Sequence, residues 1–61
     1  MNIYAYRMDC HRRAIGKRVV VLDGSNYWYG NISAVRDDDN FLVRDNAGKE
    51  HIVNVFDIRY P

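Results

Sequence analysis

The chain has 61 residues, a net charge of +1, a single cysteine, Cys10, and two histidines. One cysteine excludes a disulfide within the chain, and the histidines and the cysteine lack the spacing of a zinc site. We therefore expect one domain over residues 1–61, with no metal ion and no cofactor. Because so small a core gives little net stability, we also expect a homo-oligomer.

The N-terminal segment is basic. Residues 1–18 contain five lysines and arginines and one acid, whereas residues 19–61 contain four and seven. The segment has no long apolar run, so neither a signal peptide nor a membrane span is expected, and we expect a cytoplasmic protein without a membrane partner. A basic segment of this kind indicates a polyanionic partner, and a solvated helix face is the alternative explanation.

A short helix or ordered arm is predicted over residues 4–15. Asp9 can cap a helix at its start, and Gly16 can end it in the left-handed conformation. Ile3 and Ala5 alternate with Tyr4 and Tyr6 as in a strand, so the conformation of residues 1–8 stays open.

From residue 16 to residue 61, short apolar stretches alternate with turn residues, as is typical of a small antiparallel β structure. The Asp-Gly pair at residues 23–24 is the strongest turn signal, and residues 46–48 fit a second hairpin. Gly30 interrupts the longest strand, which is favourable only where a strand bends or a neighbouring backbone approaches closely. The pattern predicts a mainly β fold, a five-stranded SH3-like or Sm-like barrel preceded by the short N-terminal helix. The expected strands are 18–22, 27–35, 41–45, 49–55 and 58–60.

Several stretches resemble the Sm-like family that includes the RNA chaperone Hfq. Residues 10–24, CHRRAIGKRVVVLDG, resemble the end of the family's N-terminal helix, its first strand and the turn that follows. The Sm pattern of a glycine, two apolar residues, an asparagine and a further apolar residue is matched at Gly30, Ile32, Val35, Asn40 and Phe41.

This resemblance implies a non-enzymatic regulator that binds RNA and acts as an oligomeric ring. DNA is the alternative nucleic-acid ligand. Arg12 and Arg13 match the arginine-rich rim that contacts RNA in the family. The family's Tyr-Lys-His signature reads Ile-Val-Asn at residues 52–54, so Asn54 stands where the family has its histidine. The expected nucleic-acid-binding residues are Arg12, Arg13, Lys17, Arg18, Asn40, Phe41 and Asn54.

Each predicted contact also has a structural explanation. The basic residues could serve solubility and complement the C-terminal end of a helix. Phe41 could be a core residue beside Asn40 in a turn. Tyr27 and Tyr29 are expected at the surface, either in a subunit interface or stacked on a base.

Other polar residues are expected to have no ligand. The three adjacent aspartates at residues 37–39 are expected to form a solvated loop, because neighbouring residues rarely converge on a cation. His51 is expected to face solvent. No nucleophile and base pair and no phosphate-binding loop is present, so an enzyme is not expected.

The end of the chain also resembles a Tudor domain, in Asp45-Asn-Ala-Gly and the later Asn54 and Asp57. Arg44 and Ala47 stand where a reader of methylated arginine needs aromatic walls, so reading of a methylated ligand is not expected. An SH3-like or Tudor-like module that binds a protein partner is the alternative to nucleic-acid binding.

Overall fold

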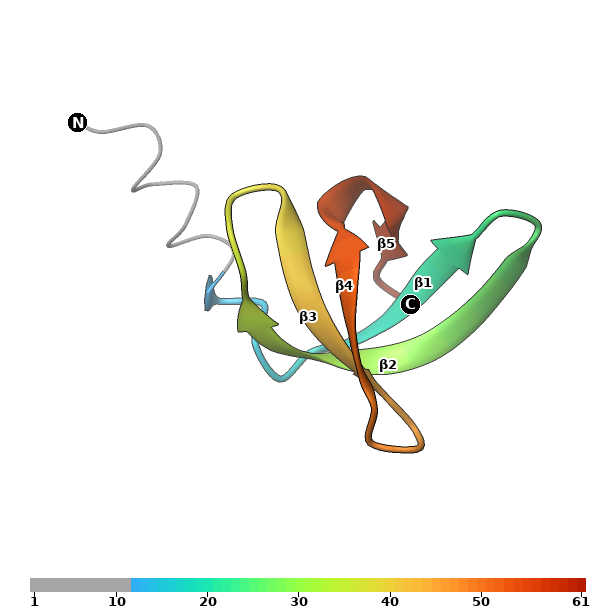
Figure 1. Cartoon of the computed structure of the whole chain (residues 1–61), viewed down its shortest axis with the longest axis horizontal. Helices are drawn as coiled ribbons and strands as arrows, with labels where there is room; N and C mark the ends of the chain where they lie inside the picture. Colours follow the sequence, from blue (N-terminus) through green and yellow to red (C-terminus); the bar gives the residue numbers. More distant parts are fainter. Residues whose placement is uncertain (1–11) are drawn as a thin grey trace.

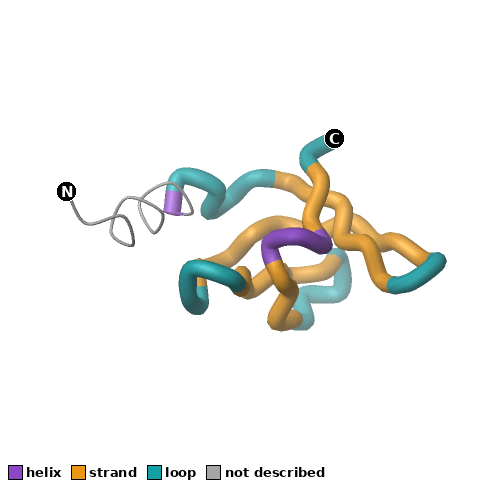
Figure 2. Tube along the Cα trace, turned by 90° about the horizontal axis from the view of Figure 1, so that it is seen from above, coloured by secondary structure: helices purple, strands orange, loops and turns teal. Residues whose placement is uncertain are grey.

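The computed structural model describes residues 12–61, which form one antiparallel sheet of five strands (Figure 1). Its elements are β1 (Arg18–Asp23), β2 (Asn26–Val35), β3 (Asn40–Asp45), β4 (Glu50–Asn54), the 3-10 turn η1 (Val55–Asp57) and β5 (Ile58–Arg59). The first four strands form successive hairpins, and η1 carries the chain from β4 to β5 (Figure 2). Because β5 pairs with β1, the strand order is β4-β3-β2-β1-β5.

The prediction of a mainly β fold with five antiparallel strands is confirmed. The prediction of a closed barrel is not confirmed. Within residues 12–61 no ladder joins β4 to β5, so the sheet has two edges. The first hairpin turns at residues 24–25, where Gly24 has a φ of 63°. Glycine is the usual residue where the first position of such a turn needs a positive φ.

The predicted helix over residues 4–15 is not seen in the described residues. Residues 4–11 lie outside them, Arg12 is helical, and residues 13–16 form a turn. In this turn the Ile15 amide donates to the Arg12 carbonyl at 3.2 Å. Gly16 has a φ of 89°, so the glycine expected at the end of this segment does adopt the left-handed conformation.

A small apolar core fills the inner side of the curved sheet. Alternate residues of the strands contribute their side chains to it, as expected where one face of each strand is buried. Val19, Ile32 and Val43 are almost completely buried, and Trp28 packs against the core from its edge. The other buried apolar residues are Ala14, Val21, Phe41, Val53 and Ile58. Within residues 12–61 no helix is long and apolar enough to cross a membrane.

Gly30 lies at the tightest contact of the sheet. A Cβ atom there would lie 2.7 Å from the Arg44 carbonyl oxygen, 2.8 Å from Cγ1 of Val43 and 2.9 Å from Cζ3 of Trp28. Of the two conditions expected to favour a glycine here, a bend or a close neighbouring backbone, the close backbone is therefore present. Three residues on, a bulge at Ser33 shifts the register between β2 and β3. The glycine and the bulge together allow β2 to bend around the core.

Replacing Gly30 with alanine is expected to lower the free energy of unfolding by about 1–3 kcal/mol, because the added methyl group overlaps backbone and packed side chains. Urea unfolding followed by the fluorescence of Trp28, the only tryptophan, measures the change. Lys49→Ala, at an exposed turn position, should stay within about 0.5 kcal/mol of the parent. Equal midpoints for Gly30→Ala and the parent would show that the contact is not restrictive.

Candidate nucleic-acid interface

Two tyrosines lie side by side on the outer face of the sheet, away from the core. In the ladder between β1 and β2, Leu22 faces Tyr27 and Val20 faces Tyr29. The side chains of Tyr27 and Tyr29 are two residues apart on one strand and therefore share a face. Their rings meet edge to face, with centroids 6.0 Å apart and an interplanar angle of 84°. Tyr27 is 65% exposed and Tyr29 is 43% exposed, so this aromatic pair is open to a ligand.

Arg18 joins this aromatic pair. Its guanidinium carbon lies 5.6 Å from the centroid of the Tyr29 ring, and its Nη1 donates to Oδ1 of Asn31 at 3.3 Å. Arg18 and Asn31 are cross-strand partners, which places the guanidinium group on the same face as the tyrosines. We call Arg18, Tyr27, Tyr29 and Asn31 the tyrosine face. It combines a cation, two exposed rings and an amide on rigid strands.

The other predicted cations lie beside or before β1. Nζ of Lys17 lies 5.9 Å from the centroid of the Tyr60 ring. Arg12 and Arg13 are exposed in the turn that precedes the strand. Arg44, next to Asn31 on β3, forms a salt bridge of 2.8 Å with Glu50. The charge of Arg44 is therefore paired with a neighbouring carboxylate, whereas within residues 12–61 the contacts of the Arg18 guanidinium group are with the neutral groups Asn31 and Tyr29.

The predicted base-contacting residues are placed elsewhere. Phe41 is 4% exposed and belongs to the core, so its ring offers no face on which a base could stack. Asn40 and Asn54 are cross-strand partners at one end of β3 and β4. Nδ2 of Asn40 donates to Oδ1 of Asp37 at 3.1 Å, and Oδ1 of Asn54 accepts from the Phe56 backbone amide at 2.9 Å. Both asparagines therefore hold their local loops in shape.

The loop of residues 37–39 gathers its carboxylates more closely than expected. Oxygens of Asp37, Asp38 and Asp39 lie within 4.8 Å of one another. The backbone amide of Asp39 donates to Oδ1 of Asp37, and this hydrogen bond, with those from Asn40, lowers the pKa of the Asp37 carboxyl. The oxygens of Asp37 thus serve the loop itself, and the cluster alone is no evidence of a bound cation.

Sequence patterns did not indicate the surroundings of His51. The side chain is half-buried, its Nε2 lies 2.8 Å from Oδ2 of Asp45, and its ring centroid lies 4.7 Å from that of Trp28. The expectation that His51 faces solvent is therefore wrong. The alternation of side chains along β4 could not show that Trp28 of β2 and Asp45 of β3 lie next to His51.

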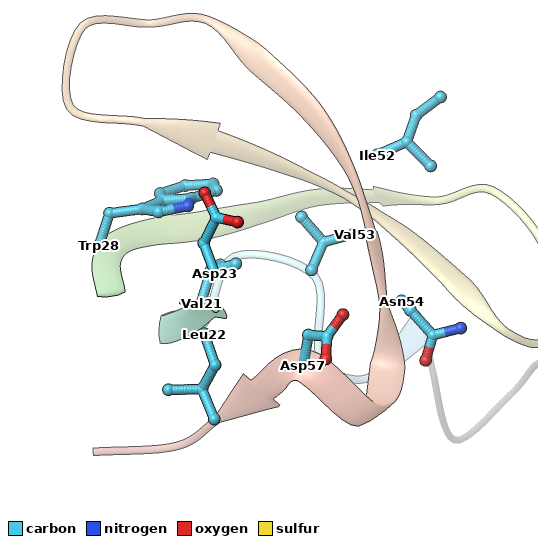
Figure 3. Close-up of a pocket in the computed structure, with 8 residues that line it drawn as sticks. All are labelled: Val21, Leu22, Asp23, Trp28, Ile52, Val53, Asn54 and Asp57. Atoms are coloured by element: carbon cyan, nitrogen blue, oxygen red, sulfur yellow. The ribbon is translucent and has the colours of Figure 1, made fainter. Parts of the chain in front are cut away.

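Two clefts border Trp28. One, of about 220 Å³, opens between β1 and β4 and includes Val21, Val53 and Asp57 in its lining (Figure 3). The other, of about 530 Å³, lies between the β1–β2 hairpin and the turn that joins β3 to β4. Asp23 and Trp28 line both clefts.

No protein-family model matches this chain, and neither the curated proteins nor the solved structures include a match.

Asp45 is predicted to make stability depend on acid pH. Its Oδ2 contacts His51, and its Oδ1 accepts from the backbone amides of Ala47 and Lys49, each at 2.9 Å. These contacts, that with His51 first, lower the pKa of Asp45 from its ordinary value of 3.8. Because the pKa is lower in the folded state, the stabilisation is present above the unfolded value and is lost as pH falls through the folded value.

Asp45→Asn should therefore lower stability at neutral pH and weaken its decline below about pH 4. Urea midpoints measured from pH 6 to pH 2 test this. Asp57→Asn is the matched control, because no side-chain hydrogen bond or ion pair is recorded for Asp57 within residues 12–61. If Asp45→Asn loses stability in acid as steeply as the parent, the carboxylate does not have this role.

Proposed function

We propose that this protein binds single-stranded nucleic acid, RNA in the first place, through the tyrosine face. The observation that carries the proposal is the placement of the Arg18 guanidinium over the exposed ring of Tyr29, with Tyr27 packed beside it. Exposed rings stack on bases of any sequence, and a neighbouring guanidinium group can bind the phosphate.

The charge around the tyrosine face supports this assignment. Arg12, Arg13, Lys17 and Arg18 lie within seven residues and lead directly into β1. A row of cations beside stacking rings allows a single strand to follow the face while its phosphates displace counterions. Asn31 holds the guanidinium group in place, because its Oδ1 accepts from Arg18 while its Nδ2 donates to the Gly16 carbonyl at 3.5 Å.

We infer that the sheet belongs to a small SH3-like or Sm-like barrel that assembles through its edges. The backbone groups of β4 alternate between those that face β3 and those that face outward. The Asp45 amide bonds to the Lys49 carbonyl, and the Val55 amide bonds to the Asp39 carbonyl. The shared register therefore leaves the amides and carbonyls of residues 50, 52 and 54 at the free edge.

The side chain of Ile52 favours the pairing of this edge with another strand. It is a β-branched apolar residue, 56% exposed, in the middle of an edge strand without a blocking proline. Such edges readily add a further strand. We propose that β4 pairs with an edge of a second copy, which supports a homo-oligomeric ring and adds the apolar contacts that one small core lacks.

The nucleic-acid proposal predicts a loss of RNA affinity of about fivefold or more in Tyr29→Ala, since a stacked base contributes about 1–3 kcal/mol. Arg18→Ala should weaken binding and reduce the salt slope by about one phosphate contact. Fluorescence anisotropy with uridine-rich and adenine-rich RNA, and with DNA of the same sequences, measures both effects over a range of salt.

The matched controls are Phe56→Ala, which removes a ring that is 75% exposed outside the tyrosine face, and Arg36→Ala, which removes an exposed arginine from the β2–β3 loop. Both should bind as the parent does. If the parent fails to bind any of these strands at low salt, the proposal is overturned.

The assembly proposal predicts that Ile52→Lys converts an oligomer to a monomer, because a charge on an edge strand opposes strand addition. Light scattering coupled to size-exclusion chromatography gives the mass. Phe56→Lys places the same charge on an exposed aromatic position outside the strands and should leave the mass unchanged. A parent that is monomeric at all concentrations would contradict the proposal.

A further inference from the structure

The larger cleft differs chemically from the tyrosine face. It has a volume of about 530 Å³ and lies where the β1–β2 hairpin approaches the β3–β4 turn. Its lining includes three residues with aromatic side chains, Trp28, Tyr29 and His51, and two aspartates, Asp23 and Asp45. No lysine or arginine is among the described residues that line it. The cleft is therefore acidic and aromatic.

The two carboxylates are not equivalent. Both carboxylate oxygens of Asp45 already have partners within the domain. Oδ1 accepts from backbone amides of the β3–β4 turn, and Oδ2 contacts His51. The side chain of Asp23 has no hydrogen bond or ion pair with any residue from 12 to 61. It borders both clefts next to Trp28, whose indole N–H also has no recorded partner in that part of the chain (Figure 3).

A ligand for this cleft needs donors for Asp23 and a surface that can lie against a ring. A phosphate would be repelled by the two carboxylates, so nucleic acid does not suit the cleft. A guanidinium group satisfies both needs, because its planar fork of donors matches a carboxylate and its face stacks on an indole ring. An ammonium group would match the charge but not the planar geometry.

We propose that this cleft binds an arginine side chain of a protein partner, with Asp23 accepting from the guanidinium group and Trp28 stacking against it. Asp45 and His51 act as positioning residues, since their contact holds the His51 ring against Trp28. Tyr29 borders both the cleft and the tyrosine face, so a protein partner and a nucleic acid would meet at this residue.

Trp28 offers a direct measurement, because it is the only tryptophan and lines the cleft. The full chain is titrated with acetyl-Gly-Arg-Gly-amide, and with the matched lysine peptide, while the Trp28 emission is recorded. The arginine peptide should give a saturable change that weakens with salt, and the lysine peptide should bind several-fold less tightly.

Asp23→Asn should weaken the arginine peptide roughly tenfold or more, as expected for loss of a charged hydrogen bond. Asparagine suits the position before a turn glycine as well as aspartate does, so this variant should keep the fold. Asp38→Asn removes the same charge from the distant β2–β3 loop and should bind as the parent does.

Two results would overturn the proposal: no saturable change of Trp28 emission in the parent, or unaltered peptide affinity in Asp23→Asn. The Asp23 variant also separates this site from the nucleic-acid site, because Asp23 is not part of the tyrosine face. Its RNA affinity should equal that of the parent, whereas Arg18→Ala should lose RNA affinity and keep the peptide affinity.

Discussion

The missing side chain at Gly30 allows β2 to lie directly against β3 at the centre of the sheet. The Arg44 carbonyl, the Val43 side chain and the Trp28 ring all occupy space that a Cβ atom would enter. The residues on either side of Gly30 depend on this contact. Trp28 lies on the inner side, where it meets His51, and Tyr29 and Asn31 lie on the outer side, where they meet Arg18.

One strand thus separates two surfaces of opposite charge. The tyrosine face carries Arg18 and continues the basic segment before β1, whereas the larger cleft carries Asp23 and Asp45. By charge alone, a polyanion would favour the tyrosine face and a cationic side chain would favour the cleft. Because Arg18, Trp28 and Tyr29 lie on strands, their backbone is held more rigidly than that of loop residues would be.

A domain of this size would gain stability from assembly. Within residues 12–61 the core has eight buried apolar residues, and the sheet leaves β4 and β5 at its edges. A domain with so few buried residues has little net stability by itself. Strand addition at β4 would satisfy the free backbone groups and cover Ile52, so one contact would contribute to both stability and assembly.

Local sequence determined the strands, the turns and the outward direction of the tyrosines. Alternation gives the side of a strand on which a residue lies, and glycine marks the places where φ is positive or where space is lacking, as Gly24 and Gly30 show. These properties depend on residues close together in the chain and can be predicted from it. For Phe41 the sequence left two positions open, in the core or on a base-contact surface.

The tertiary structure decided which strands meet. It placed Phe41 in the core, away from the tyrosine face, and brought His51 of β4 to Trp28 of β2 and Asp45 of β3. It also gathered the carboxylates of residues 37–39 through the hydrogen bonds of one loop. Such contacts depend on cross-strand register and curvature, which arise from packing between distant segments and not from the pattern within any one of them.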